Sequence, residues 1–286
     1  MREELNKHLT NNVVLRIDYI PLPDEKVDTI NNILAKKFLV EDKKFSDSKQ
    51  TFMRSIDIQM NDPSIQDFNE FINIREKSKV KSYEYYKLSD DNSNIEMKLI
   101  FNRQFCAIDV NQLIKYYKYE SYRDIFIDVL SILKDNEIIV NRFGLRKFND
   151  FFLNLSAPVG DYVNEKYFNL DCDDILDGSN SLISEKRYNF SKEIYNVNLT
   201  THSSVGKLDN DIVKRIAFDI DLYITDMQNL QKLFELNNDK FIDGVNDLLF
   251  EIYINVLEDK MKKLLNKSSE LDDKNIIYGV DYNENA

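Results

Sequence analysis

The chain has 286 residues and carries 50 acidic against 38 basic side chains, which gives a net charge of -12. This acidic balance argues against a general nucleic-acid-binding protein, because phosphate contacts require clustered Lys and Arg. No stretch has the length and apolarity of a transmembrane helix, and two cysteines are too few for a disulfide framework. These properties predict a soluble cytoplasmic protein without a membrane partner, long enough for one large domain or two smaller ones.

The first part of the chain shows strand and helix patterns in alternation. Residues 13–20 alternate apolar and polar side chains, as in a half-buried strand, and residues 25–38 repeat apolar side chains at helical spacing. Turn-forming residues 89–94 indicate a hairpin between two further strands. The remaining elements expected here are a strand at 51–60, a loop or short helix over 61–74, strands at 80–87, 95–101 and 105–109, and a helix at 121–133.

The second part begins with the longest expected strand, at residues 138–150, which we place at the centre of the fold. An apolar-to-turn segment at 151–161 and a loop rich in Asp at 171–181 follow it. Three more strands are expected at 182–188, 194–201 and 213–223. A long amphipathic helix is expected at 240–265, followed by a polar, frayed tail.

These patterns predict an α+β fold, with amphipathic helices packed on one face of one antiparallel sheet or of two consecutive sheets. Both halves read as strands followed by a helix, so we expect two similar strand-rich halves. The expected divisions are an N-terminal half at 1–160, an acidic connecting loop at 161–181, a C-terminal half with the long helix at 182–265, and a polar tail at 266–286.

The expected central strand places Val140, Arg142, Gly144, Arg146 and Phe148 on one face, because successive strand residues point to opposite sides. A glycine between two arginines of the same face indicates a bulge, a bend, or the close approach of another backbone or a ligand. Two fixed guanidinium groups could grip a carboxylate or phosphate. The alternative, which we favour, is that they pair with acidic side chains of neighbouring strands.

Asp219 and Asp221 share a face of the strand expected at 213–223 and are candidate ligands for Mg²⁺ or Mn²⁺. A metal nuclease needs a further acid and often a lysine, for which Lys214 is the nearest candidate. The favoured alternative is a solvated strand face, or pairing with Arg142 and Arg146. We therefore expect no metal and no cofactor.

A zone rich in tyrosine and lysine is the one locally basic part of the chain. Tyr with Lys suits stacking on a single nucleic-acid strand or a protein-binding hot spot, and Tyr116 and Tyr117 are the candidate binding residues. The favoured alternative is a set of sheet edges made soluble by lysines. The zone comprises Lys79, Lys81, Tyr83, Tyr85, Tyr86, Lys87, Lys115, Tyr116, Tyr117, Lys118, Tyr119 and Tyr122.

The nine residues R-F-G-L-R-K-F-N-D at 142–150 resemble the R-x-G-L-R-x-x-N signature of a sporadically distributed family of uncharacterised bacterial proteins. The layout around them is also similar: an early strand ends in I-P-L-P, and the strand A-F-D-I-D-L-Y precedes a C-terminal helix. Lys147 stands where that family commonly has tyrosine. The resemblance implies no settled activity. The family is scattered among bacteria in the way that genes of phages, defence islands and toxin–antitoxin loci are. It carries over Arg142, Gly144, Arg146 and Asn149 as signature residues, with a structural or a binding role.

The first functional hypothesis is a non-enzymatic, macromolecule-binding or regulatory protein of a bacterial mobile-element, phage or defence system. Its expected partner is a protein, since the net charge disfavours nucleic acid, and a homodimer is left open. The second is a metal-dependent nuclease or phosphotransfer enzyme that uses Asp219 and Asp221, with Arg142 and Arg146 gripping phosphate. The third is an acidic decoy that mimics nucleic acid, which requires the acidic side chains to line one face at a spacing like that of phosphates.

Overall fold

A computed structural model of the chain describes residues 7–60, 72–168, 183–208, 211–235, 238–266, 273–276 and 281–282. Within these residues, nine strands form a single antiparallel sheet, and two short strands, β1 (Lys7–His8) and β11 (Asp281–Tyr282), pair separately. In sheet order the nine are β3 (Asp47–Met60), β4 (Ile72–Leu88), β5 (Ile95–Asn102), β6 (Phe105–Asn111), β2 (Thr10–Tyr19), β7 (Val140–Asn154), β10 (Asp211–Ile224), β9 (Tyr195–Leu208) and β8 (Ile183–Lys192).

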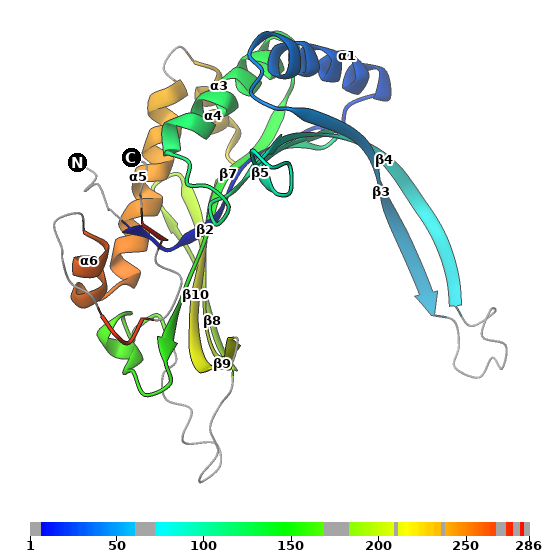
Figure 1. Cartoon of the computed structure of the whole chain (residues 1–286). Helices are drawn as coiled ribbons and strands as arrows, with labels where there is room; N and C mark the ends of the chain where they lie inside the picture. Colours follow the sequence, from blue (N-terminus) through cyan, green and yellow to red (C-terminus); the bar gives the residue numbers. More distant parts are fainter. Residues whose placement is uncertain are drawn as a thin grey trace.

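The helices that the structure describes all lie over one face of this sheet, and the opposite face is concave (Figure 1). The predicted α+β class is therefore confirmed. Among the described residues, no helix combines the length and the apolarity needed to cross a membrane. The helical elements are α1 (Asp24–Ala35), η1 (Lys36–Glu41), α3 (Tyr119–Asp135), η2 (Val159–Asp161), α4 (Met227–Gln231), η3 (Lys232–Phe234), α5 (Asn238–Val256) and α6 (Asp259–Leu265).

One continuous sheet crosses the boundary expected near residue 160. Strand β7 is hydrogen-bonded to β2 on one side and to β10 on the other. Four strands lie outside β2 and three lie outside β7, so the sheet extends from a central β2–β7 pair in both directions. Of the two arrangements left open, one sheet or two, the structure has one. The expected loop over 61–74 falls mostly outside the described residues, as does most of the acidic loop at 161–181.

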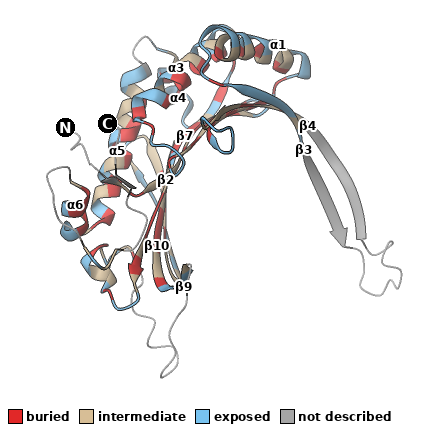
Figure 2. Ribbon diagram, viewed as in Figure 1, coloured by how far each residue is buried: buried red, intermediate tan, exposed pale blue. Residues whose placement is uncertain are grey.

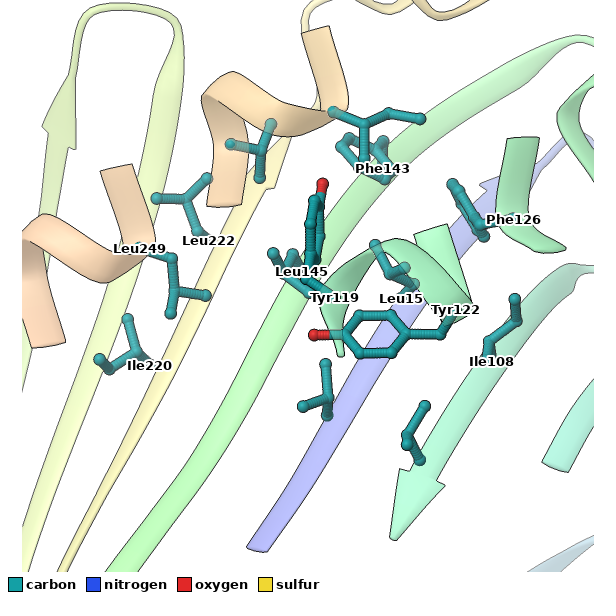
Figure 3. Packing of buried hydrophobic residues seen from close by; sticks show 14 of the residues in the cluster. Leu15, Ile108, Tyr119, Tyr122, Phe126, Phe143, Leu145, Ile220, Leu222 and Leu249 are labelled. Atoms are coloured by element: carbon teal, nitrogen blue, oxygen red, sulfur yellow. The ribbon is translucent and has the colours of Figure 1, made fainter. Parts of the chain in front are cut away.

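The hydrophobic core lies between the sheet and the helices, because one side of each middle strand is apolar at every second residue. Leu15 of β2, Leu145 of β7 and Leu222 of β10 are fully buried there, facing Phe126 of α3 and Leu249 of α5 (Figure 3). Buried residues follow the middle strands and the helices that face them (Figure 2). These residues belong to a single cluster, which ties the two parts of the chain together.

The alternation predicted along the central strand is interrupted at Asn141. The pairing of β2 with β7 shifts register there, since Asp18 is opposite Arg142 while Tyr19 is opposite Val140. Such a bulge turns the residues on its two sides to different faces. The prediction that Val140 shares the face of Arg142 is therefore wrong, and Val140 is buried in the core.

The long closing helix expected at 240–265 is instead two helices, α5 and α6. Beyond Val256 the backbone bonds to another segment: the Glu258 amide donates to the Tyr162 carbonyl oxygen at 3.0 Å, and the Asn164 amide donates to the Val256 carbonyl oxygen at 2.9 Å. Leu257 also forms an antiparallel bridge with Val163. These bonds replace those that would continue the helix, so the chain turns before α6 begins at Asp259.

The tail is attached to the sheet where the structure describes it, at residues 273–276. The Asn154 amide donates to the Asn275 carbonyl oxygen at 2.8 Å, and Ile276 forms a bridge with Leu153 at the end of β7. Asp273 accepts hydrogen bonds from the Tyr162 hydroxyl at 2.7 Å and pairs with Lys260 at 3.0 Å. The expected fraying is therefore wrong for these four residues.

Candidate functional site

The candidate site is the helix-free face of the sheet, which we call the open face. It is formed by the residues of the middle strands that alternate with the core residues, and it is concave (Figure 1). Four of the five residues predicted to share a face, Arg142, Gly144, Arg146 and Phe148, do lie together on it. Its central members are Arg16 and Asp18 from β2, Arg142, Gly144, Arg146, Phe148 and Asp150 from β7, and Arg215, Asp219, Asp221 and Tyr223 from β10.

Arg142 links three neighbouring strands through its guanidinium group. It donates to Asp18 of β2 at 3.3 Å and to Asp221 of β10 at 3.2 Å. The same guanidinium lies 4.9 Å from the centre of the Tyr223 ring, a cation–π distance. Arg142 is thus held by two carboxylates and an aromatic ring, all from strands other than its own.

Gly144 makes room for this arrangement. Asp221 lies directly opposite Arg146, four residues along β7 from Arg142, so the Arg142 side chain must extend along β7 past position 144 to reach it. A Cβ atom at position 144 would lie 3.2 Å from Arg142 Nη2 and 3.3 Å from Tyr223 Cβ. The glycine between the two arginines therefore permits the close approach of a guanidinium from the same strand.

Replacing Gly144 by Ala is expected to lower the free energy of unfolding by about 1 kcal/mol, because the new methyl group displaces Arg142 from Asp221. Chemical denaturation followed by circular dichroism measures this change. In an Arg142→Met background the same substitution should cost much less, since the guanidinium is already gone. An equal cost in both backgrounds would show that Tyr223, rather than Arg142, requires the glycine.

Arg146 and Asp219 form the second pair. Arg146 Nε donates to Asp219 Oδ1 at 2.8 Å, and its Nη2 donates to Oδ2, so the contact has the bidentate geometry of strong guanidinium–carboxylate pairs. This hydrogen bonding raises the pKa of Arg146 above its ordinary value. Arg146 nevertheless remains 56% exposed, which makes it the most accessible arginine at the centre of the open face.

Both aspartates predicted as candidate metal ligands are thus hydrogen-bonded to arginines, Asp219 to Arg146 and Asp221 to Arg142. Burial raises the pKa of Asp221, and the positive charge of Arg142 opposes that rise. Lys214 donates to the Ala157 carbonyl oxygen at 2.9 Å, away from both carboxylates. Among the described residues, no three His, Cys, Asp or Glu side chains are grouped so as to hold a metal ion.

A third pair, not anticipated from the sequence, joins Asp150 to Arg215. Asp150 is 5% exposed and accepts from Arg215 at 2.9 and 2.7 Å, while Asn11 donates to its other oxygen. The Arg215 guanidinium also lies 5.7 Å from the centre of the Phe148 ring. The only sequence signal for this pair was that Asp150 ends the nine-residue motif, since its partner is 65 positions away.

Asn149, the fourth signature residue, lies on the other side of the sheet and is fully buried. Its side chain accepts from the Thr10 hydroxyl at 2.8 Å and donates to the Phe218 carbonyl oxygen at 3.2 Å. It therefore connects β7 to β2 and β10 within the core. This position assigns Asn149 to the framework beneath the open face rather than to the face itself.

The tyrosines and lysines of the basic zone do not form one accessible surface. Tyr117 is 8% exposed, and its hydroxyl donates to the buried Glu96, while the Lys87 ammonium lies 4.7 Å from its ring centre. Burial raises the pKa of Tyr117. Tyr116 is exposed and stacks on His8 with 4.6 Å between ring centres. Other members of the zone are buried in the core, namely Tyr85, Tyr119 and Tyr122.

No family model matches the chain, and no curated protein matches it. The resemblance carried by residues 142–149 therefore stays a prediction. What the structure adds is a physical account of those residues: two arginines paired across strands, a glycine that makes room for one of them, and an asparagine that joins three strands.

Proposed function

We propose that the chain is a non-enzymatic binding protein that recognises another protein through the open face. The observation that carries this proposal is the chemistry of that face: its charged side chains are paired with one another across three strands. A metal ion or a phosphate would have to displace these ion pairs, whereas arginines held in place are well suited to recognition. Arg is enriched at protein interfaces, and a guanidinium already held in place loses little freedom on binding.

The alternation of charge favours a protein over a nucleic acid as the partner. Each central arginine has a carboxylate within hydrogen-bonding distance, so the face offers little uncompensated positive charge to a phosphate backbone. The same pairing disfavours a nucleic-acid decoy, which requires uncompensated acids. A partner with both acidic and basic groups could compete for both members of each pair. The resemblance would place this binding in a mobile-element, phage or defence system.

Affinity capture from native-host lysate tests the proposal, with the wild type compared with Arg146→Glu. The control variant is Lys36→Glu, which makes the same charge change at an exposed position on η1, outside the open face. We expect wild type and Lys36→Glu to recover the same protein and Arg146→Glu to recover about tenfold less of it, as for loss of a moderate interface contact. Thermal unfolding should show that both variants are folded.

Nuclease treatment of the lysate separates the two kinds of partner. If the captured protein is lost after nuclease treatment, it was held by nucleic acid and the proposal of a protein partner fails. If Arg146→Glu and Lys36→Glu recover the same protein in equal amounts, the open face is not the binding surface.

A further inference from the structure

The open face ends in two isoleucines where β2 finishes and β7 begins. Ile20 directly follows β2, and its amide donates to the carbonyl oxygen of Ile139, which precedes β7, at 3.0 Å. The facing pair before them is Tyr19 with Val140, and both of those side chains are buried in the core. Because successive residues point to opposite sides, Ile20 and Ile139 point to the side of the open face.

These two isoleucines, which we call the apolar rim, are accessible to a partner. Ile20 is 51% exposed and Ile139 is 54% exposed. Single exposed apolar side chains are common on soluble proteins, but two that face each other form a joined apolar surface. The next facing pair on the same side is Asp18 with Arg142, so the apolar rim is continuous with the charged centre of the open face.

The turn between β5 and β6 lies alongside Ile20 and carries an arginine without an acidic partner. The Tyr19 amide donates to the Gln104 carbonyl oxygen at 3.0 Å, and the Leu22 amide donates to the Arg103 carbonyl oxygen at 2.8 Å. Among the arginine side chains that the structure describes, Arg103 is the only one without a carboxylate at ion-pair distance. Its Nε atom is buried and has no hydrogen-bond partner.

An arginine without a carboxylate beside an exposed apolar pair indicates which chemical groups fit this end of the open face. A guanidinium binds a carboxylate strongly, and a buried donor without an acceptor is costly in the free chain. Exposed apolar side chains at an interface are the natural contact for an apolar anchor of the partner. Arg142 and Arg146 differ from Arg103, because each already has an aspartate as its partner.

We propose that the partner of the open face places an apolar side chain on Ile20 and Ile139 and an acidic side chain on Arg103. This inference rests on the proposed function, since it names the chemistry of the protein segment that the open face recognises. A nucleic-acid phosphate would compensate Arg103 but would gain nothing from the two isoleucines. The combination therefore favours a protein segment in which an apolar and an acidic residue are neighbours.

Substitutions at the apolar rim and at Arg103 test the first part of the inference, with the protein recovered by wild-type affinity capture as the probe. Ile139→Asp removes an apolar contact and adds a charge that repels the partner's carboxylate, and it should recover about tenfold less of that protein. Arg103→Gln should show a loss of about the same size, whereas Ile139→Leu should stay within about threefold of the wild type.

Val40→Asp is the matched control, because Val40 is 67% exposed and lies on η1, outside the open face. It should recover as much of the protein as the wild type does. Thermal unfolding should show that every variant is folded, since changes at exposed positions cost little stability.

Photo-crosslinking tests the chemistry of the partner directly. A photoreactive benzoylphenylalanine replaces Ile139 in one sample and Val40 in the control, and mass spectrometry identifies the segment that is joined. We expect the captured protein to be joined from position 139 but not from position 40, through a segment that contains an apolar residue next to Asp or Glu. A cross-link to nucleic acid, or to a segment without acidic residues, overturns the inference.

Failure of the inference can be told apart from failure of the proposed function. Capture that is weakened by Arg146→Glu but not by Ile139→Asp or Arg103→Gln overturns the role of the apolar rim and leaves the open face as the binding surface. Capture that none of these three substitutions weakens overturns both.

Discussion

Replacing Phe143 by Ala is expected to lower the free energy of unfolding by about 3–5 kcal/mol, as for other large-to-small changes in a closed core. Phe143 is fully buried on β7 and lies where two helices meet the sheet (Figure 3). Its ring centre is 5.7 Å from that of Phe126 on α3 and 6.4 Å from that of Phe241 on α5. Removing it leaves a cavity between three elements, which can close only if those elements shift toward one another.

Urea denaturation followed by circular dichroism measures this loss. Phe190→Ala is the matched control, because it removes the same side chain from a position that is 42% exposed and should cost no more than about 1 kcal/mol. Losses of the same size at the two positions would contradict the assignment of Phe143 to the centre of the core.

Replacing Arg142 by Met is expected to cost about 2 kcal/mol at neutral pH, because it leaves Asp221 without its hydrogen-bonded arginine, whereas Asp18 keeps its hydrogen bonds from Arg16. Removing one member of a fully buried ion pair typically costs about 3–5 kcal/mol. The effect here should be smaller, since Arg142 is 27% exposed and Asp221 is 21% exposed, so water partly screens both charges.

The cost should depend on pH in a definite direction. Burial raises the pKa of Asp221 above 3.8, and Arg142 opposes this rise, so its removal should raise that pKa further. A carboxyl group whose pKa is raised by folding favours the folded state below its unfolded pKa, and this stabilisation is lost as the pH rises through the raised value. The deficit of Arg142→Met should therefore be largest at neutral pH and should shrink as the pH falls toward 3.8.

Urea denaturation at neutral pH and at about pH 4.5 tests this expectation. The double variant Arg142→Met/Asp221→Asn also removes the negative charge of Asp221. It should recover part of the lost free energy of unfolding at neutral pH, and its stability should change less with pH. If the deficit of Arg142→Met is the same at both pH values, the ionised Asp221 carboxylate is not its source.

Much of the fold can be predicted from the sequence wherever the pattern involves residues close together in the chain. Strict alternation over residues 13–20 indicated β2, and helical spacing over 25–38 and 121–133 indicated the region of α1 and most of α3. These signals are reliable because each concerns neighbours within a few positions, and the burial of one side follows directly from the period. The same reasoning placed Arg142, Gly144 and Arg146 on one face. A local signal was also missed at α4, whose N-terminus is capped by Asp226 through the Asn229 amide at 2.9 Å.

What the local pattern could not supply are contacts between residues far apart in the chain. The partners of Arg142 are 124 and 79 positions away, and those contacts explain why position 144 is glycine. The end of α5 at Val256 follows from bonds to residues 162–164, which no helical periodicity near 256 reveals. The order of the strands, the bulge at Asn141 and the burial of Tyr117 and Asn149 are of the same kind. Periodicity in the sequence determines which side of a helix or strand is apolar. Only the tertiary structure determines which residues pack against that side and which residues pair with the charged side opposite it.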